Sequence, residues 1–245
     1  MGLWQRLKKW GHQYASPAGF DRFCGYFLPW MTPLAWLLFA TALIWGLAFA
    51  PADYQQKDSY RIIFIHVPTA ALSMSIYVMM AAASFIYFVW RVDICATFAR
   101  AAAPYGALMT ALALVTGAIW GKPTWGTYWT WEPRLTSELI LLFIYLAYIL
   151  LQASVEDRQQ ADRLCSILAI VGVINIPIIH YSVVWWNSIH QGATLFKLAR
   201  PSMPPSMLWP LLLSLIAFYL LFFSYVLKAM QNLILERRIQ RVLAG

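Results

Sequence analysis

The sequence has few charged residues. Only 11% of its 245 residues are Asp, Glu, Lys or Arg, whereas 61% are hydrophobic. A soluble domain of this length cannot bury so much apolar surface in one core, so the composition excludes an ordinary soluble protein and indicates that the lipid bilayer is the solvent. Internal repeats, low-complexity tracts and linkers are also absent from the sequence. We therefore expect a single integral membrane domain over residues 1–245.

Cysteine is scarce, and the three that occur are Cys24, Cys95 and Cys165. No pair has the spacing of a zinc site and no Cys-x-x-Cys-His motif occurs, which argues against structural zinc and against a c-type haem attached to this chain. All three thiols are expected on the cytoplasmic side, where thiols stay reduced. A P-loop is absent too, so any ATP hydrolysis would belong to another subunit, and we expect no enzymatic activity.

Long hydrophobic runs are abundant. A helix needs about 20 apolar residues to cross the hydrocarbon layer. Runs of about that length lie near residues 28–50, 62–90, 101–120, 135–153, 164–181 and 208–228. Because each helix satisfies its own backbone hydrogen bonds in lipid, the sequence predicts an all-α fold, a polytopic bundle of six transmembrane helices.

Lysine and arginine are distributed unequally between the two sides of such a bundle, with twice as many on one side as on the other. By the positive-inside rule, both termini are predicted to be cytoplasmic. The predicted segments outside the lipid are an amphipathic tail at 1–23, outer loops at 121–136 and 182–207, and a second cytoplasmic tail at 229–245. The net charge of +8 follows from this bias. The basic residues are scattered over the ends of the predicted helices, which argues against nucleic-acid binding.

Tryptophan is concentrated between the third and fourth predicted helices, where residues 120–138 read WGKPTWGTYWTWEPRLTSE. A few tryptophans at a helix end are expected, because the ring prefers the membrane–water boundary, but four in one connection exceed what anchoring requires. We therefore predict that a flat, apolar ligand lies against this segment, with Gly126 allowing close approach of the backbone. The residues assigned to this platform are Trp120, Trp125, Gly126, Trp129, Trp131 and Glu132.

Two histidines lie near the ends of other apolar runs on the same predicted side, His66 in YRIIFIHVPTA and His180 in INIPIIHYSVVWW. A metal-binding residue at membrane depth is a functional candidate, because its desolvation is costly without a partner. Either histidine alone is better explained by a hydrogen bond to a neighbouring carbonyl or hydroxyl group. As a pair beside the tryptophans, they predict the two axial ligands of a haem iron. His12 and His190 lie in polar segments and are interpreted as solvated.

Haem b fits this set better than a bare metal ion, because the sequence shows no carboxylate–histidine cluster of the zinc or di-iron type. Arg61 and Arg134 are the candidates to bind the propionates, since a guanidinium can hold a carboxylate with two hydrogen bonds. Both are also explained as membrane-edge side chains that reach for water. Glu132 and Glu138 flank Arg134, and this spacing predicts an ion pair between Arg134 and a neighbouring glutamate. Intramembrane polar groups such as Thr116 are expected to join helices through hydrogen bonds.

The residues WGTYWTWEP resemble the WGxxWxWD signature of tryptophan-rich haem-handling membrane proteins, with Glu132 where the signature has Asp. The chain from about residue 25 to 192 also looks like the haem exporter protein C (CcmC) family, through FAPADYQQ, SYRIIFIHVP, ALVTGAIWGKPTWGTYWTWEPRLTSEL and INIPIIHYSVVWWNSIHQG, in that order. The resemblance implies that His66 and His180 are outward-facing axial ligands and that the tryptophans form the haem platform.

The same resemblance implies a function in the bacterial inner membrane. Such a protein holds haem b at the periplasmic face and delivers it to a periplasmic haem chaperone during c-type cytochrome biogenesis. The implied partners are that chaperone, an ABC-type ATPase with its membrane subunit, and a small single-span protein. Two other classes remain open: a b-type cytochrome, which would need haem ligands near both membrane faces, and a transporter permease, which would need polar groups at the midplane.

Overall fold

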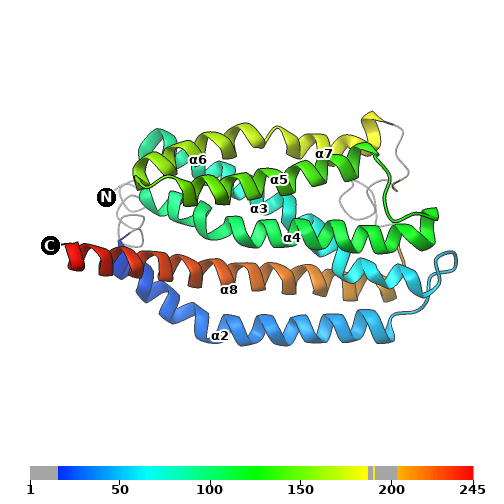
Figure 1. The fold of residues 1–245 in the computed structure, drawn as a ribbon. Coiled ribbons are helices and arrows are strands. Elements are labelled where there is room, and N and C mark those ends of the chain that lie inside the picture. The colour runs from blue at the N-terminus through cyan, green and yellow to red at the C-terminus, as the bar shows by residue number, and fades with distance from the viewer. Residues whose placement is uncertain (1–15, 187–189, 191–202, 245) are drawn as a thin grey trace, which may run out of the picture.

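The computed structural model describes residues 16–186, 190 and 203–244. The long helices run back and forth along one common axis (Figure 1). In chain order they are α2 (Pro17–Ile44), the π-helical η1 (Trp45–Phe49), the 3-10 helix η2 (Asp58–Ile62), α3 (Ile63–Trp90), α4 (Asp93–Trp125), α5 (Pro133–Ser154), α6 (Arg158–Gly172), α7 (Asn175–Trp185) and α8 (Pro205–Ala244). An isolated bridge between Asp53 and Lys57 is the only β pairing in the described residues.

Six helical stretches in the described residues are long and apolar enough to cross a membrane, which confirms the predicted six-span bundle. They are Ala18–Phe49, Asp58–Trp90, Asp93–Trp125, Pro133–Ser154, Arg158–Trp185 and Pro205–Gln240. The fifth stretch combines α6 and α7, which are separated by a turn at residues 173–174. Pro177 explains the interruption, because its nitrogen has no proton to donate to the carbonyl of Val173.

Several helices extend beyond the predicted hydrophobic runs. Ser16 caps α2 by accepting a hydrogen bond from the Gly19 N–H at 3.1 Å, so residues 17–23, predicted as part of a surface tail, begin the first helix instead. At the other end of the chain, α8 continues for 40 residues, and residues 229–244 prolong this helix to a length of about 60 Å. Residues 1–15 of the predicted tail lie outside the described residues.

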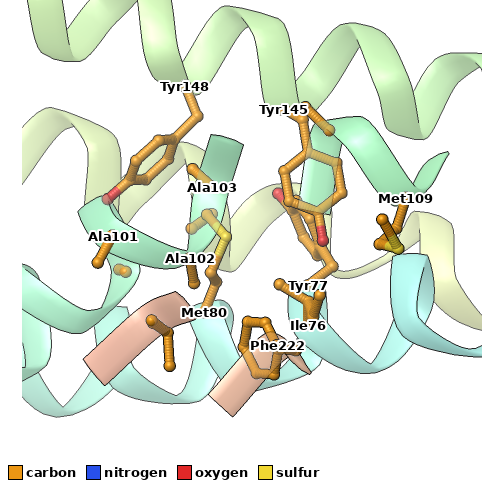
Figure 2. Close-up of a cluster of buried hydrophobic side chains, with 14 of the residues drawn as sticks. Ile76, Tyr77, Met80, Ala101, Ala102, Ala103, Met109, Tyr145, Tyr148 and Phe222 are labelled. Carbon is orange, nitrogen blue, oxygen red and sulfur yellow. The ribbon is translucent and has the colours of Figure 1, made fainter. Parts of the chain in front are cut away.

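The central core is built where α3 and α5 pack over small residues of α4. Figure 2 shows Tyr77 of α3 and Tyr145 of α5 pointing toward each other, while Ala101–Ala103 of α4 lie nearer Met80 and Tyr148 in the same core. The ring centroids of Tyr77 and Tyr145 are 5.2 Å apart, in an edge-to-face arrangement. A Cβ atom at Gly106 would overlap the ring of Tyr145, so the small residues of α4 are what allow the helices to approach.

Hydrogen bonds between helices reinforce this packing, as expected for intramembrane polar groups. The hydroxyl of Tyr145 donates to the carbonyl of Ser73 at 2.8 Å. The side-chain amide of Asn175 donates to the carbonyl of Ser137 at 2.9 Å, which ties α7 to α5. Since α7 also carries residues of the candidate site, this bond contributes to positioning that site.

The two ends of the bundle differ in what they carry (Figure 1). The start of α2 and the end of α8 lie at one end, called the terminal end below. The connection between α4 and α5 lies at the opposite end, the tryptophan end. Cys24, Cys95 and Cys165 are free thiols near the starts of α2, α4 and α6. Which end faces the cytoplasm stays a prediction.

Candidate functional site

A narrow cavity lies inside the tryptophan end, between α3, α4, α5 and α7. Apolar side chains form most of its walls, and two histidines, an arginine and a glutamate supply the polar groups. The lining residues are His66, Ala70, Met74, Ala113, Leu114, Arg134, Leu135, Glu138, Ile179 and His190. Apolar walls with a few convergent polar groups are typical of ligand sites.

His66 lies in the first turn of α3, and residues of α4 hold its imidazole ring. Its Nδ1 lies 3.0 Å from the Oγ1 of Thr116, and its ring packs edge-to-face with that of Trp120, with 5.6 Å between the ring centroids. Trp120 in turn donates from Nε1 to the Oε1 of Gln56 at 2.8 Å. A Cβ at Gly117 would lie 3.0 Å from the Cε1 of His66, so this glycine makes room for the ring.

His190 reaches the same cavity from the chain beyond α7. Its Nδ1 lies 3.0 Å from the Oε1 of Glu132, and only 16% of its side chain is exposed. Its ring packs on Trp125 at 4.6 Å between centroids. Burial lowers the pKa of His190 below its ordinary value, against the opposing effect of the Glu132 carboxylate, which favours the neutral imidazole that binds metals. The interpretation of His190 as a solvated histidine is therefore wrong.

His180 does not line this cavity. The buried residues of α7 are Asn175, Ile179 and Ser182. They recur at the spacing of one helix face, and Ile179 is the one that lines the cavity. His180 is exposed, because it follows Ile179 by about 100° around the helix axis. The expected constellation of His66 with His180 is thus not brought together; the structure brings His66 and His190 to one cavity instead.

The acidic residues near Arg134 do not form the ion pair predicted from the sequence. The Oε1 of Glu132 caps α5 by accepting from the Leu135 N–H at 2.8 Å. Glu138 points toward α3 and accepts from the Oγ of Ser73 at 2.6 Å. Arg134 lines the cavity and makes no ion pair within the part of the chain that the structure describes. Its guanidinium is therefore available to an anion in the cavity.

Arg61 is engaged elsewhere. It lies in η2, and its Nη1 donates to the carbonyl of Leu47 at 2.5 Å. Its Nη2 pairs with the Oδ1 of Asp58 at 3.2 Å. These contacts fasten η1 to the start of the second span. Arg61 does not line the cavity, so Arg134 is the better placed of the two candidate propionate partners.

The tryptophans of the platform divide into two groups. Trp120 and Trp125 contact the two histidines, whereas Trp129 and Trp131 contact each other at 5.4 Å between centroids, and 77% of Trp131 is exposed. Gly126 ends α4 with a φ of 80°, a conformation that glycine adopts readily. A Cβ there would meet no protein atom within 4 Å, so the backbone conformation accounts for this glycine within the protein, and close approach of a ligand stays a prediction.

Three residues around the cavity were not assigned to the site from the sequence: Thr116, Gly117 and His190. The sequence did contain a signal for the orientation of α7. Asn175 and Ser182 are seven residues apart, so they lie on one face of the helix and mark it as the inward face, and His180 does not lie on that face. No comparable signal existed for Thr116 and Gly117, because nothing local shows that α4 lies against His66.

The residues that line the cavity suit a haem better than a bare metal ion. Within the described residues, no group of three or more His, Cys, Asp or Glu could hold a metal ion. Two histidines, apolar walls and an arginine with no ion-pair partner among the described residues are groups that a haem with its propionates would use. His66 and His190 would hold the iron, and Arg134 a propionate.

Comparison with known proteins points the same way. The profile of the family described as CcmC, Heme exporter protein C, matches residues 10–244. Heme exporter protein C of Escherichia coli (strain K12) is 48% identical over 233 residues, which cover 95% of this chain and 92% of the relative. The protein of that name from Haemophilus influenzae is 48% identical over 214 residues, 87% of each chain. That from Rhodobacter capsulatus is 39% identical over 230 residues, 93% of this chain and 95% of the relative.

Proposed function

Since this chain belongs to the Heme exporter protein C family, we propose that it binds haem b at the tryptophan end and delivers it to a periplasmic haem chaperone during c-type cytochrome biogenesis. The tryptophan end would face the periplasm from the bacterial inner membrane. The observation that carries the proposal is the cavity in which two histidines, distant in sequence, meet an arginine. The name of the relatives supports haem as the cargo.

His66 and His190 are the axial ligands in this proposal, and His190 takes the place first given to His180. Both line the cavity, and each has its Nδ1 within hydrogen-bonding distance of an oxygen, that of Thr116 or that of Glu132. Such partners fix the orientation of a ligating ring and make Nε2 the coordinating atom. Bound haem would supply an iron that accepts two imidazoles.

Arg134 binds a propionate in this proposal. A guanidinium holds a carboxylate through two charge-assisted hydrogen bonds, and Arg134 faces the cavity without an ion pair among the described residues. The apolar walls, which include Met74, Leu114 and Ile179, would help to exclude water from a bound haem. Trp125 supports the ring of His190.

Delivery is a transfer between proteins. The cavity lies at the end of the bundle, where a partner outside the membrane can reach haem without entering lipid. Release has to break two bonds from histidine to iron, and a chaperone that bonds haem covalently through its own histidine makes that release favourable. An ABC-type ATPase, its membrane subunit and a small single-span protein are the further partners proposed for the complex.

The test of ligation compares three histidine variants. Haem spectra of the purified protein should lose their low-spin form in His66→Ala and in His190→Ala, and added imidazole should restore it by filling the vacant position. His180→Ala is the matched control and should keep the spectrum of the parent protein. Loss of the low-spin form in His180→Ala, with His190→Ala unaffected, would return the second ligand to His180. Unchanged spectra in both His66→Ala and His190→Ala would reject the site.

The test of delivery uses a strain that lacks this protein. The haem chaperone should be present there without covalent haem, and c-type cytochromes should be absent until the gene is returned. If the chaperone acquires covalent haem at normal levels in that strain, delivery is rejected. Reduction of the bound haem by quinol in the purified protein would then favour a b-type cytochrome.

A further inference from the structure

We infer that Thr116 is a positioning residue that sets the tautomer of His66, by holding the imidazole proton at Nδ1 and leaving the lone pair at Nε2. The tautomer is a property of the protein without any ligand. Only its consequence for iron rests on the proposed function.

The hydrogen bonds of Thr116 give the assignment. Its Oγ1 lies 2.6 Å from the carbonyl oxygen of Leu112 and 3.3 Å from that of Ala113. Two oxygen atoms at 2.6 Å need a proton between them, and a hydroxyl has one proton to donate. That proton goes to the carbonyl of Leu112. The hydroxyl oxygen then faces the Nδ1 of His66 at 3.0 Å as an acceptor, so Nδ1 carries the imidazole proton.

This tautomer is the less common one in water, where a neutral imidazole carries its proton mainly at Nε2. In the fold, Nδ1 is turned toward α4, and His66 contributes to the lining of the cavity. Among the side chains of the described residues, the hydrogen-bond partner of the His66 ring is Thr116, at Nδ1. A proton at Nε2 would occupy the atom that has to coordinate a metal, so the contact with Thr116 reverses an unfavourable intrinsic preference.

The ring of His66 is held in place by other groups as well. The absent side chain of Gly117 leaves the Cε1 of His66 just enough room. Trp120 packs edge-to-face with the ring and is itself hydrogen-bonded to Gln56. Removing the hydroxyl of Thr116 is therefore expected to change where the proton lies while leaving the ring in position.

The chain offers a matched control on the same helix. Thr110 is fully buried, and its Oγ1 donates to the carbonyl of Gly106 at 2.8 Å, the same bond from position i to i−4 that Thr116 makes. Thr110 has no contact with a histidine among the hydrogen bonds of the described residues. Thr110→Val and Thr116→Val thus remove the same local bond, and only the second also removes the acceptor for Nδ1.

The tautomer can be read by nitrogen NMR of the ligand-free protein, with 15N-labelled histidine and the His66 resonances assigned by their loss in His66→Ala. The parent protein, Thr110→Val and Thr116→Ser should show neutral His66 protonated at Nδ1, because serine keeps the hydroxyl. Thr116→Val should shift the proton mainly to Nε2. An unchanged tautomer in Thr116→Val, or Nε2 protonation in the parent protein, would overturn the inference.

Haem titration tests the consequence for iron. Thr116→Val should bind haem about 10-fold more weakly, at the lower end of the effects seen when outer partners of metal-ligating histidines are removed. Thr116→Ser and Thr110→Val should bind as the parent protein does. Equal affinity in Thr116→Val despite a changed tautomer would refute the effect on iron. Failure of the parent protein to bind haem would reject the proposed function instead, and NMR would still decide the tautomer.

Discussion

Both ends of the bundle contain buried or half-buried charged side chains, but these side chains have different surroundings at the two ends. At the terminal end, Asp162 lies 4.0 Å from Arg100 and 3.6 Å from Arg158, so opposite charges meet one another. At the tryptophan end, Arg134 has no ion-pair partner among the described residues and faces a cavity that also holds two histidines. Charges that meet one another join helices, whereas polar groups that face a cavity are available to a ligand.

The terminal end also contains a hollow, which shows that empty space alone does not mark a functional site. Its lining residues are Tyr87, Asp93, Arg158, Gln159, Asp162, Arg237 and Gln240. Several of these are already in contact with other protein groups. Arg237 donates from Nη2 to the Oγ1 of Thr97 at 2.6 Å, and the Oδ1 of Asp162 accepts from Gln152 at 3.2 Å. We therefore assign this hollow a structural role.

The largest expected effect concerns which end faces outward. By the predicted orientation, alkaline phosphatase fused after Thr127, in the connection between α4 and α5, should be active. The same enzyme fused after Val242, near the end of α8, should be inactive, because it needs an oxidising compartment. Phosphatase assays on cells that make equal amounts of each fusion measure this. The reverse result would put the cavity on the cytoplasmic side and remove the proposed access for a periplasmic partner.

The second prediction tests the structural role of the terminal end. Asp162→Ala should lower the free energy of unfolding by about 3 kcal/mol, because two partly buried arginines lose their counter-charge. Asp21→Ala is the control, since its pair with Arg238 is well exposed and is worth less than about 1 kcal/mol. Thermal unfolding in detergent compares the two. Haem affinity per folded molecule should stay unchanged, and a specific loss of affinity in Asp162→Ala would contradict the division between the ends.

A third prediction separates the two arginines near the tryptophan end. Arg134→Gln should weaken haem binding about 10-fold, through loss of a charge-assisted bond to a propionate, with little change in stability. Arg61→Gln should lower stability instead, because Arg61 holds the carbonyl of Leu47 and the carboxylate of Asp58. Haem titration and thermal unfolding of both variants measure this. A larger loss of haem affinity in Arg61→Gln would transfer the propionate role to Arg61.

The smallest expected effects concern the tryptophans. Trp125→Leu should reduce haem affinity about 3-fold, because an aromatic contact contributes roughly 0.5–1.5 kcal/mol and Trp125 packs on His190. Trp131→Leu should do less, as most of that side chain is exposed. Both variants, and Trp129→Leu, should remain in the membrane. If c-type cytochromes mature normally in all three variants, the tryptophans serve only to anchor the chain at the membrane–water boundary.

The six spans were predictable because the bilayer imposes a length and a composition on every helix that crosses it. Their ends were less predictable. The prediction began the first helix near residue 28, but Ser16 and Pro17 start α2 through a capping bond and a favoured first-turn proline, as their residue types would have allowed. The end of α8 carries charged residues, and a hydropathy criterion therefore stops before the helix does.

By itself, the sequence determined the membrane environment, the number of spans and the kind of residues gathered at one end, because these follow from local composition and from the thickness of lipid. Only the tertiary structure decided which of those residues share a cavity. His180 sits on an apolar helix but faces away from the cavity, whereas His190 lies in a polar segment and reaches it beside Glu132. The direction of a side chain depends on the rotation of its helix and on contacts between segments far apart in the chain, and neither is a property of the local sequence.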